Sequence, residues 1–117
     1  MNQMNIEKIT GEIENLLTNS GDRKRCEQVF DLSQTLCDTE QISMTEVQQL
    51  SLLSHLSAMV HRSLTGEKLA PIDRTLFTEI STESLTMAKK LKESLTNLEE
   101  DEIYLLSIHF EVAKQNL

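Results

Sequence analysis

Aromatic residues are scarce in this 117-residue chain, which contains three phenylalanines, one tyrosine and no tryptophan. One proline and three glycines leave few points at which regular structure has to break. Because β-strands are enriched in aromatic and β-branched residues, the scarcity of aromatics argues against a β-sandwich or β-barrel. The 18 leucines are instead typical of helices. The composition therefore predicts an all-α protein.

Cysteines are also few, and long apolar runs are missing from the sequence. Cys26 and Cys37 are too few for a disulfide framework, so we expect two reduced cysteines that act as small apolar residues. No stretch approaches the ~20 apolar residues that a membrane-spanning helix needs, and no secretory leader is visible. These features predict a cytoplasmic protein without a membrane partner.

Basic residues are outnumbered, with 11 lysines and arginines against 19 acidic residues and a net charge of −8. Such a charge repels phosphate backbones. The basic runs at residues 23–25 and 89–92 are not interleaved with aromatic side chains, which favours solvated helix faces. We therefore expect no direct binding of nucleic acid, and the length fits one domain over residues 1–117.

Turn residues divide the chain into helical segments in which apolar residues recur every three or four positions. The segments cover approximately residues 6–19, 22–38, 43–65, 72–95 and 98–113. The third begins with the capping-box spacing Ser43 to Glu46 and ends before Gly66, and the fourth changes phase near Ser81. The pattern predicts a bundle of about five helices. Its expected buried stripes include Ile6, Ile9, Ile13, Val47, Leu64 and Leu76.

Two of the three histidines project onto or beside a predicted buried face. His55 lies at the rim of its apolar arc, with Arg62 about 20° away and two turns later. His109 lies in the middle of an apolar face, with Glu102 about 20° away and two turns earlier. His61 projects among polar positions and is expected to face solvent. A core built only for stability would use leucine, although a buried, hydrogen-bonded histidine remains the structural alternative.

Other chemistries lack their sequence signatures. Helical metal sites usually place acid or histidine ligands three or four positions from a histidine, and neither His55 nor His109 has such a neighbour. The sequence has no glycine-rich phosphate loop and no nucleophile elbow. We therefore expect no enzymatic activity, no cofactor and no metal.

Two segments carry a family resemblance. The segment Leu52 to Arg62, with an arginine seven residues after His55, resembles the first histidine motif of the PTS regulation domain family. The segment Asp101 to Phe110, an Asp-Glu pair followed by an apolar stretch and His109, resembles the second motif. The order, separation and helical plan also agree, so the resemblance spans nearly the whole chain.

The resemblance implies a helical regulatory domain, often dimeric, that accepts phosphoryl groups from phosphocarrier proteins of the bacterial sugar phosphotransferase system. It makes His55 and His109 candidate phosphoacceptors, with Arg62, Asp101 and Glu102 as supporting positions. The length leaves no room for the nucleic-acid-binding module that usually accompanies such domains. We therefore expect a stand-alone homodimeric module that controls carbohydrate uptake or transcription through a partner. The alternative is a helical adaptor or dimerisation protein that keeps the fold without phosphorylation.

Overall fold

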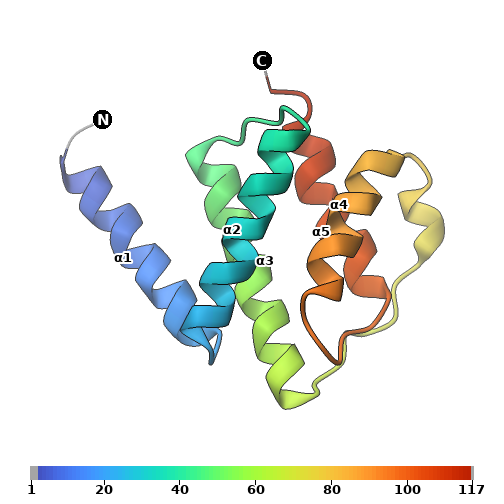
Figure 1. Ribbon diagram of the computed structural model, residues 1–117, viewed down its shortest axis with the longest axis horizontal. Helices are drawn as coiled ribbons and strands as arrows, with labels where there is room; N and C mark the ends of the chain where they lie inside the picture. Colours follow the sequence, from blue (N-terminus) through green and yellow to red (C-terminus); the bar gives the residue numbers. More distant parts are fainter. Residues whose placement is uncertain (1–2, 117) are drawn as a thin grey trace.

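A computed structural model describes residues 3–116, and the side chains of residues 10–116, as a helical bundle (Figure 1). The elements are α1 (Gln3–Asn19), α2 (Arg23–Thr39), α3 (Glu46–Thr65), the 3-10 helix η1 (Arg74–Phe77), α4 (Thr82–Glu93) and α5 (Asp101–Ala113). Residues 3–116 contain no strand, which confirms the predicted all-α class. Over the same range, no helix combines the length and the apolar character that crossing a membrane requires.

Helix α3 is the centre of the bundle. It packs against α1, α2 and α5, while α4 packs against α5 and α2. Figure 1 shows α4 and α5 lying side by side, with η1 at the outside of this pair. Different faces of α3 therefore contact three other helices, and the predicted histidine segments of α3 and α5 become neighbours.

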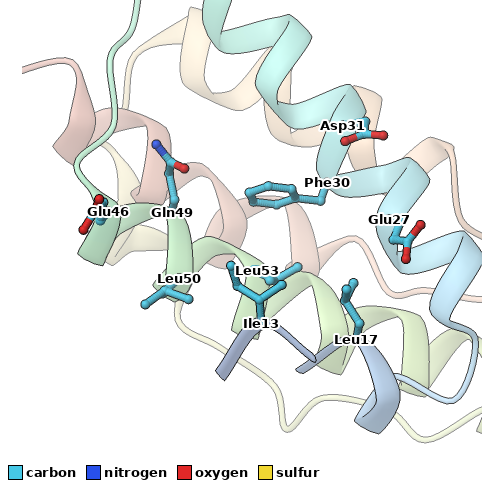
Figure 2. Close-up of a pocket in the computed structure, with 9 residues that line it drawn as sticks. All are labelled: Ile13, Leu17, Glu27, Phe30, Asp31, Glu46, Gln49, Leu50 and Leu53. Carbon is cyan, nitrogen blue, oxygen red and sulfur yellow. The ribbon is translucent and has the colours of Figure 1, made fainter. Parts of the chain in front are cut away.

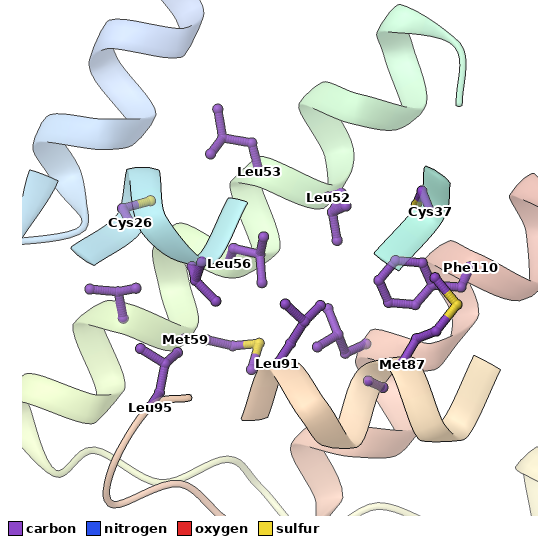
Figure 3. Close-up of a cluster of buried hydrophobic side chains, with 14 of the residues drawn as sticks. Cys26, Cys37, Leu52, Leu53, Leu56, Met59, Met87, Leu91, Leu95 and Phe110 are labelled. Atoms are coloured by element: carbon purple, nitrogen blue, oxygen red, sulfur yellow. The ribbon is translucent and has the colours of Figure 1, made fainter. Parts of the chain in front are cut away.

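The core contains leucine, methionine and valine side chains together with Phe110, which lies at one side of the cluster near Met87 (Figure 3). All five α-helices contribute to it, through residues such as Leu17, Cys26, Leu56, Leu91 and Phe110. Both cysteines are buried with free thiols, as predicted. Burial raises the pKa of Cys37 to about 11, so its thiol stays protonated and packs as an apolar group.

Three residues of the predicted stripes are exposed instead of buried: Val47 is 76% exposed, Leu64 48% and Leu76 77%. Val47 and Leu64 occupy the first and last turns of α3, and periodicity does not show how far the neighbouring helices extend. Leu76 lies in η1, which has no buried residue. The side chains of Ile6 and Ile9 fall outside the described residues.

The start of α3 differs from the sequence prediction by two residues. The capping box is formed by Thr45 and Gln48 and not by Ser43 and Glu46, with the reciprocal bonds 3.2 and 3.0 Å long. Residues 40–42 are already used to close α2: the N–H of Ile42 donates to the carbonyl of Cys37 at 2.8 Å. The chain can enter the next helix only after this turn.

The predicted change of phase near Ser81 is confirmed, because Ser81 is the N-cap of α4. Its backbone N–H and hydroxyl both donate to Oε1 of Glu111 on α5, at 3.1 and 2.7 Å, and the hydroxyl of Ser84 donates to the same oxygen at 2.8 Å. A carboxylate at a helix N-terminus is electrostatically favourable. This contact fixes α4 on the helix that carries His109.

Candidate functional site

The structure brings the two predicted histidines together. Nδ1 of His55 on α3 lies 3.0 Å from Nε2 of His109 on α5, and the ring centroids are 5.1 Å apart at a tilt of 59°. One ring donates a hydrogen bond to the other, since a neutral imidazole has one N–H and one acceptor nitrogen. The His55 side chain is 16% exposed, so the pair lies between the core and the surface.

Arg62 and Glu102 form a second pair beside the histidines. Nε and Nη2 of Arg62 donate to Oε2 and Oε1 of Glu102, each at 2.7 Å, in the bidentate arrangement favoured by guanidinium and carboxylate. The Glu102 side chain is 2% exposed and that of Arg62 15%. Oε1 of Glu102 also lies 4.0 Å from Nε2 of His55. The four side chains form a continuous row, which we call the histidine cluster: Arg62, Glu102, His55 and His109.

The partners within this cluster lie across helices, which differs from the sequence prediction. Helical projection grouped His55 with Arg62 and His109 with Glu102. Residues seven apart are about 10.5 Å apart along a helix axis, too far for direct contact, although they point to the same side. The packing of α3 on α5 supplies the nearer partners, and Glu102 contacts Arg62 of α3.

The charge states of the cluster follow from this packing. Burial, followed by the neighbouring His55 ring, lowers the pKa of His109 to about 4. Burial alone would raise the pKa of Glu102, but its contacts with His55 and Arg62 outweigh this effect and lower the pKa. At neutral pH His109 is therefore an uncharged imidazole with a nucleophilic lone pair, and Glu102 is a carboxylate balanced by Arg62.

Asp101 does not join the cluster. Its Oδ1 accepts a hydrogen bond from Nε of Arg74 at 2.8 Å, and its Oδ2 lies 3.4 Å from the N–H of Ile72. The guanidinium of Arg74 also lies 5.0 Å from the centroid of the Tyr104 ring. Asp101 thus fastens the η1 segment to α5, while the next residue, Glu102, faces the histidines. The sequence pattern did not identify Arg74, because apolar periodicity in residues 72–95 draws attention to the expected buried stripe and not to a charged residue beside it.

His61, the third histidine, is exposed as predicted. Beside His109, the outer face of α5 exposes Ile108 at 39% and Val112 at 53%. The predicted apolar face around His109 is therefore only partly covered. This leaves apolar surface next to the histidine cluster.

Replacing Asp101 with alanine is expected to loosen the η1 segment, because the change removes the partner of both Arg74 and the Ile72 N–H. The Arg74 side chain is already 53% exposed, so the cost in stability should be only about 1 kcal/mol. The main effect should be faster trypsin cleavage after Arg74 in the folded protein. Replacing Asp38, an exposed aspartate of α2, with alanine is the control. Equal cleavage rates in the two variants would show that Asp101 does not hold this segment.

Comparison with known proteins agrees with this arrangement. The family model of the PRD domain matches residues 31–113, which include all four residues of the histidine cluster and Asp101. The chain is similar to the protein in the crystal structure of a PRD-containing transcription regulator from Lactobacillus casei. The two sequences are 33% identical, the match covers 92% of this chain and 96% of the regulator chain, and the TM-score is 0.84. No curated protein matches. The chain belongs to the PRD domain family, whose members are regulatory domains.

Proposed function

We propose that this chain is a cytoplasmic regulatory module, one domain over residues 1–117, that is phosphorylated on His109, His55 or both. Phosphocarrier proteins of the sugar phosphotransferase system are the proposed donors. The single observation that carries the proposal is the contact between His55 and His109 beside the Arg62–Glu102 ion pair. Two partly buried imidazoles and one compensated charge form a site that an added phosphate would reorganise.

His109 is the better of the two acceptors in this geometry. Its Nδ1 has no hydrogen bond within the described residues, and its low pKa keeps the ring uncharged. The ring nitrogen of His55 that does not face His109 lies 4.0 Å from the Glu102 carboxylate, which repels an incoming phosphoryl group. In the transfer, a lone pair of His109 forms the new N–P bond while the N–P bond to the carrier histidine breaks, and the carrier nitrogen keeps that electron pair.

The consequence of phosphorylation follows from charge. A phosphoryl group adds about two negative charges and strong acceptor oxygens. Arg62 is the cation that the structure places in the cluster, and it is already bound to Glu102. The phosphate therefore competes with Glu102 for the guanidinium, and a carboxylate that is 2% exposed loses its partner. The contact between α3 and α5 is the part of the fold that we expect to rearrange.

The proposed readout is a change in self-association or partner binding that controls carbohydrate uptake or transcription. The exposed Ile108 and Val112 lie on α5 close to His109 in sequence, so an altered α3–α5 contact would change this surface. Added negative charge on a chain that already carries −8 also opposes association of two copies. We propose a homodimer that is sensitive to phosphorylation, with no direct contact to nucleic acid.

A phosphorylation assay tests this function. The wild-type protein is incubated with labelled phosphoenolpyruvate and the general phosphotransferase proteins, and the acid-labile label is measured. Replacing His109 with alanine is expected to remove at least about nine-tenths of the label, because it removes the favoured nucleophile. The variants His55→Ala and His55→Ala/His109→Ala complete the series. The exposed His61 provides the matched control, His61→Ala, which should be labelled like wild type.

Circular dichroism of each variant establishes that it is folded before its label is compared. If wild type takes no label from a panel of cognate carriers, the phosphoacceptor function is wrong and the non-phosphorylated adaptor is favoured. Loss of label in His61→Ala would place the acceptor outside the histidine cluster.

A further inference from the structure

A groove lies between the first three helices, away from the histidine cluster. Helices α1 and α2 meet at the turn around Gly21 and diverge from it, with α3 beneath them (Figure 1). The space between them contains a cavity of about 440 Å³. We call it the α1–α2–α3 groove. None of the residues that line it belongs to the histidine cluster.

The floor of the groove is apolar. Figure 2 shows the side chains of Ile13, Phe30 and Leu50, one from each helix, directed toward the hollow above the buried Leu17 and Leu53. The first three are only partly buried, so the groove presents apolar surface to solvent. Apolar surface that is concave and drawn from three helices is suited to accept side chains of another helix.

The rim of the groove is acidic on both sides. Figure 2 places Glu46 on the α3 side and Glu27 and Asp31 on the α2 side. Glu27 is bound to Arg23 at 2.8 Å, whereas Asp31 and Glu46 have no ion pair within the described residues. Among the residues whose side chains the structure describes, no lysine or arginine lines the groove. Its electrostatic complement is therefore an apolar segment flanked by positive charges.

We propose that the α1–α2–α3 groove binds one amphipathic helix of a partner protein, with apolar side chains on the Phe30 floor and lysine or arginine beside Asp31 and Glu46. The cavity of about 440 Å³ lies where the three helices meet. Ridge-into-groove packing lets a partner helix place side chains spaced three and four residues apart in such a hollow. This interaction is independent of phosphorylation of the histidine cluster.

A binding titration tests the proposal. The probe is a fluorescein-labelled synthetic helix of about 16 residues made of leucine and lysine, with leucines at helical spacing on one face. Fluorescence anisotropy is measured against the full chain at physiological ionic strength, so that unspecific attraction is screened. We expect saturable binding, and no binding of the peptide in which glutamate replaces every lysine.

Two double variants of equal net charge separate the groove from the general negative charge of the protein. Asp31→Lys/Glu46→Lys reverses both rim charges and is expected to weaken binding at least about tenfold. Glu67→Lys/Glu79→Lys makes the same charge change at exposed positions outside the groove and should change affinity less than about twofold. Circular dichroism and thermal unfolding show that both variants are folded.

Equal weakening by the two double variants, or equal binding of both peptides, would overturn the proposal by showing unspecific attraction. Sedimentation of the protein without peptide adds a further outcome. Asp31→Lys/Glu46→Lys could abolish self-association while the peptide fails to disrupt the wild-type dimer. That result would mean that a second copy of the chain occupies the groove, and the cationic-helix proposal would be wrong. Chemical-shift changes that the peptide causes only in the methyl groups of Ile13, Leu50 and Leu53 would support binding of the cationic helix in the groove.

Discussion

Replacing Arg62 with methionine is expected to lower the free energy of unfolding by about 3 kcal/mol. Methionine retains an apolar stem but removes both guanidinium bonds to Glu102. The Glu102 carboxylate is 2% exposed, and the nearest remaining partner is Nε2 of His55 at 4.0 Å. A buried carboxylate without a partner loses its hydration without compensation, which is why the effect is large. Urea denaturation at neutral pH measures it.

Two further variants make this result specific to burial. Arg74→Met removes an ion pair whose arginine is 53% exposed, and it should cost less than about 1 kcal/mol. The double variant Arg62→Met/Glu102→Leu replaces the buried ion pair with apolar groups and should recover most of the lost stability. If Arg62→Met and Arg74→Met prove equally mild, the Glu102 carboxylate is hydrated in solution and the cluster is more open than the structure shows.

This measurement also bears on the proposed switch. A phosphoryl group on His109 would draw Arg62 from the same carboxylate, so the cost of Arg62→Met indicates how strongly phosphorylation disturbs the α3–α5 contact. A large cost favours rearrangement of the contact upon phosphorylation. A cost near zero would leave the proposed readout without a physical driving force.

The stability of the wild-type protein is expected to fall as the pH decreases from 6.5 toward 4. His109 in the unfolded chain binds a proton near its ordinary pKa of 6.5, whereas burial and the neighbouring His55 lower its pKa in the folded protein to about 4. Between these values the unfolded state binds more protons, so acid favours unfolding. The accumulated loss is on the order of 2–3 kcal/mol. Urea denaturation across this pH range measures it.

His109→Gln tests the assignment of this pH dependence, because glutamine can contact His55 without titrating. Its stability should change less than that of wild type between pH 6.5 and 4.5. The exposed His61 gives the control His61→Gln, which should follow wild type. Below pH 4.5 carboxylates add to the loss, since Glu102 and Glu111 have lowered pKa values in the folded protein. Coincident profiles for His109→Gln and wild type would show that His109 is hydrated in the folded state.

Local sequence patterns predicted much of the fold. Apolar spacing of three and four residues locates all five α-helices, because a helix buries one face and that face repeats with the helical period. The αL conformation of Gly66, with φ of 77°, ends α3 where predicted. The same periodicity wrongly placed Leu76 in the core, since its segment forms a short 3-10 helix on the outside of α5. Apolar periodicity therefore predicts burial only where the segment forms an α-helix that packs on the core.

The candidate site was predicted only in part. The motifs singled out His55, Arg62, Glu102 and His109. Helical projection placed these residues on the faces of α3 and α5 that meet in the structure. Projection around one helix axis gives direction but contains no information about the crossing and axial offset of two helices. Whether Glu102 meets His109 or Arg62 depends on that offset.

The sequence alone determined the helices, the apolar faces and the membership in the PRD domain family, because all three follow from residue type and spacing along the chain. The tertiary structure decided the contacts: the histidine pair, the buried ion pair beside it, and the attachment of η1 through Asp101 and Arg74. It also created the α1–α2–α3 groove, whose floor joins residues of three helices. These features depend on how helices pack against one another, and that packing is set by the complementary side chains of the whole core, which no single segment encodes.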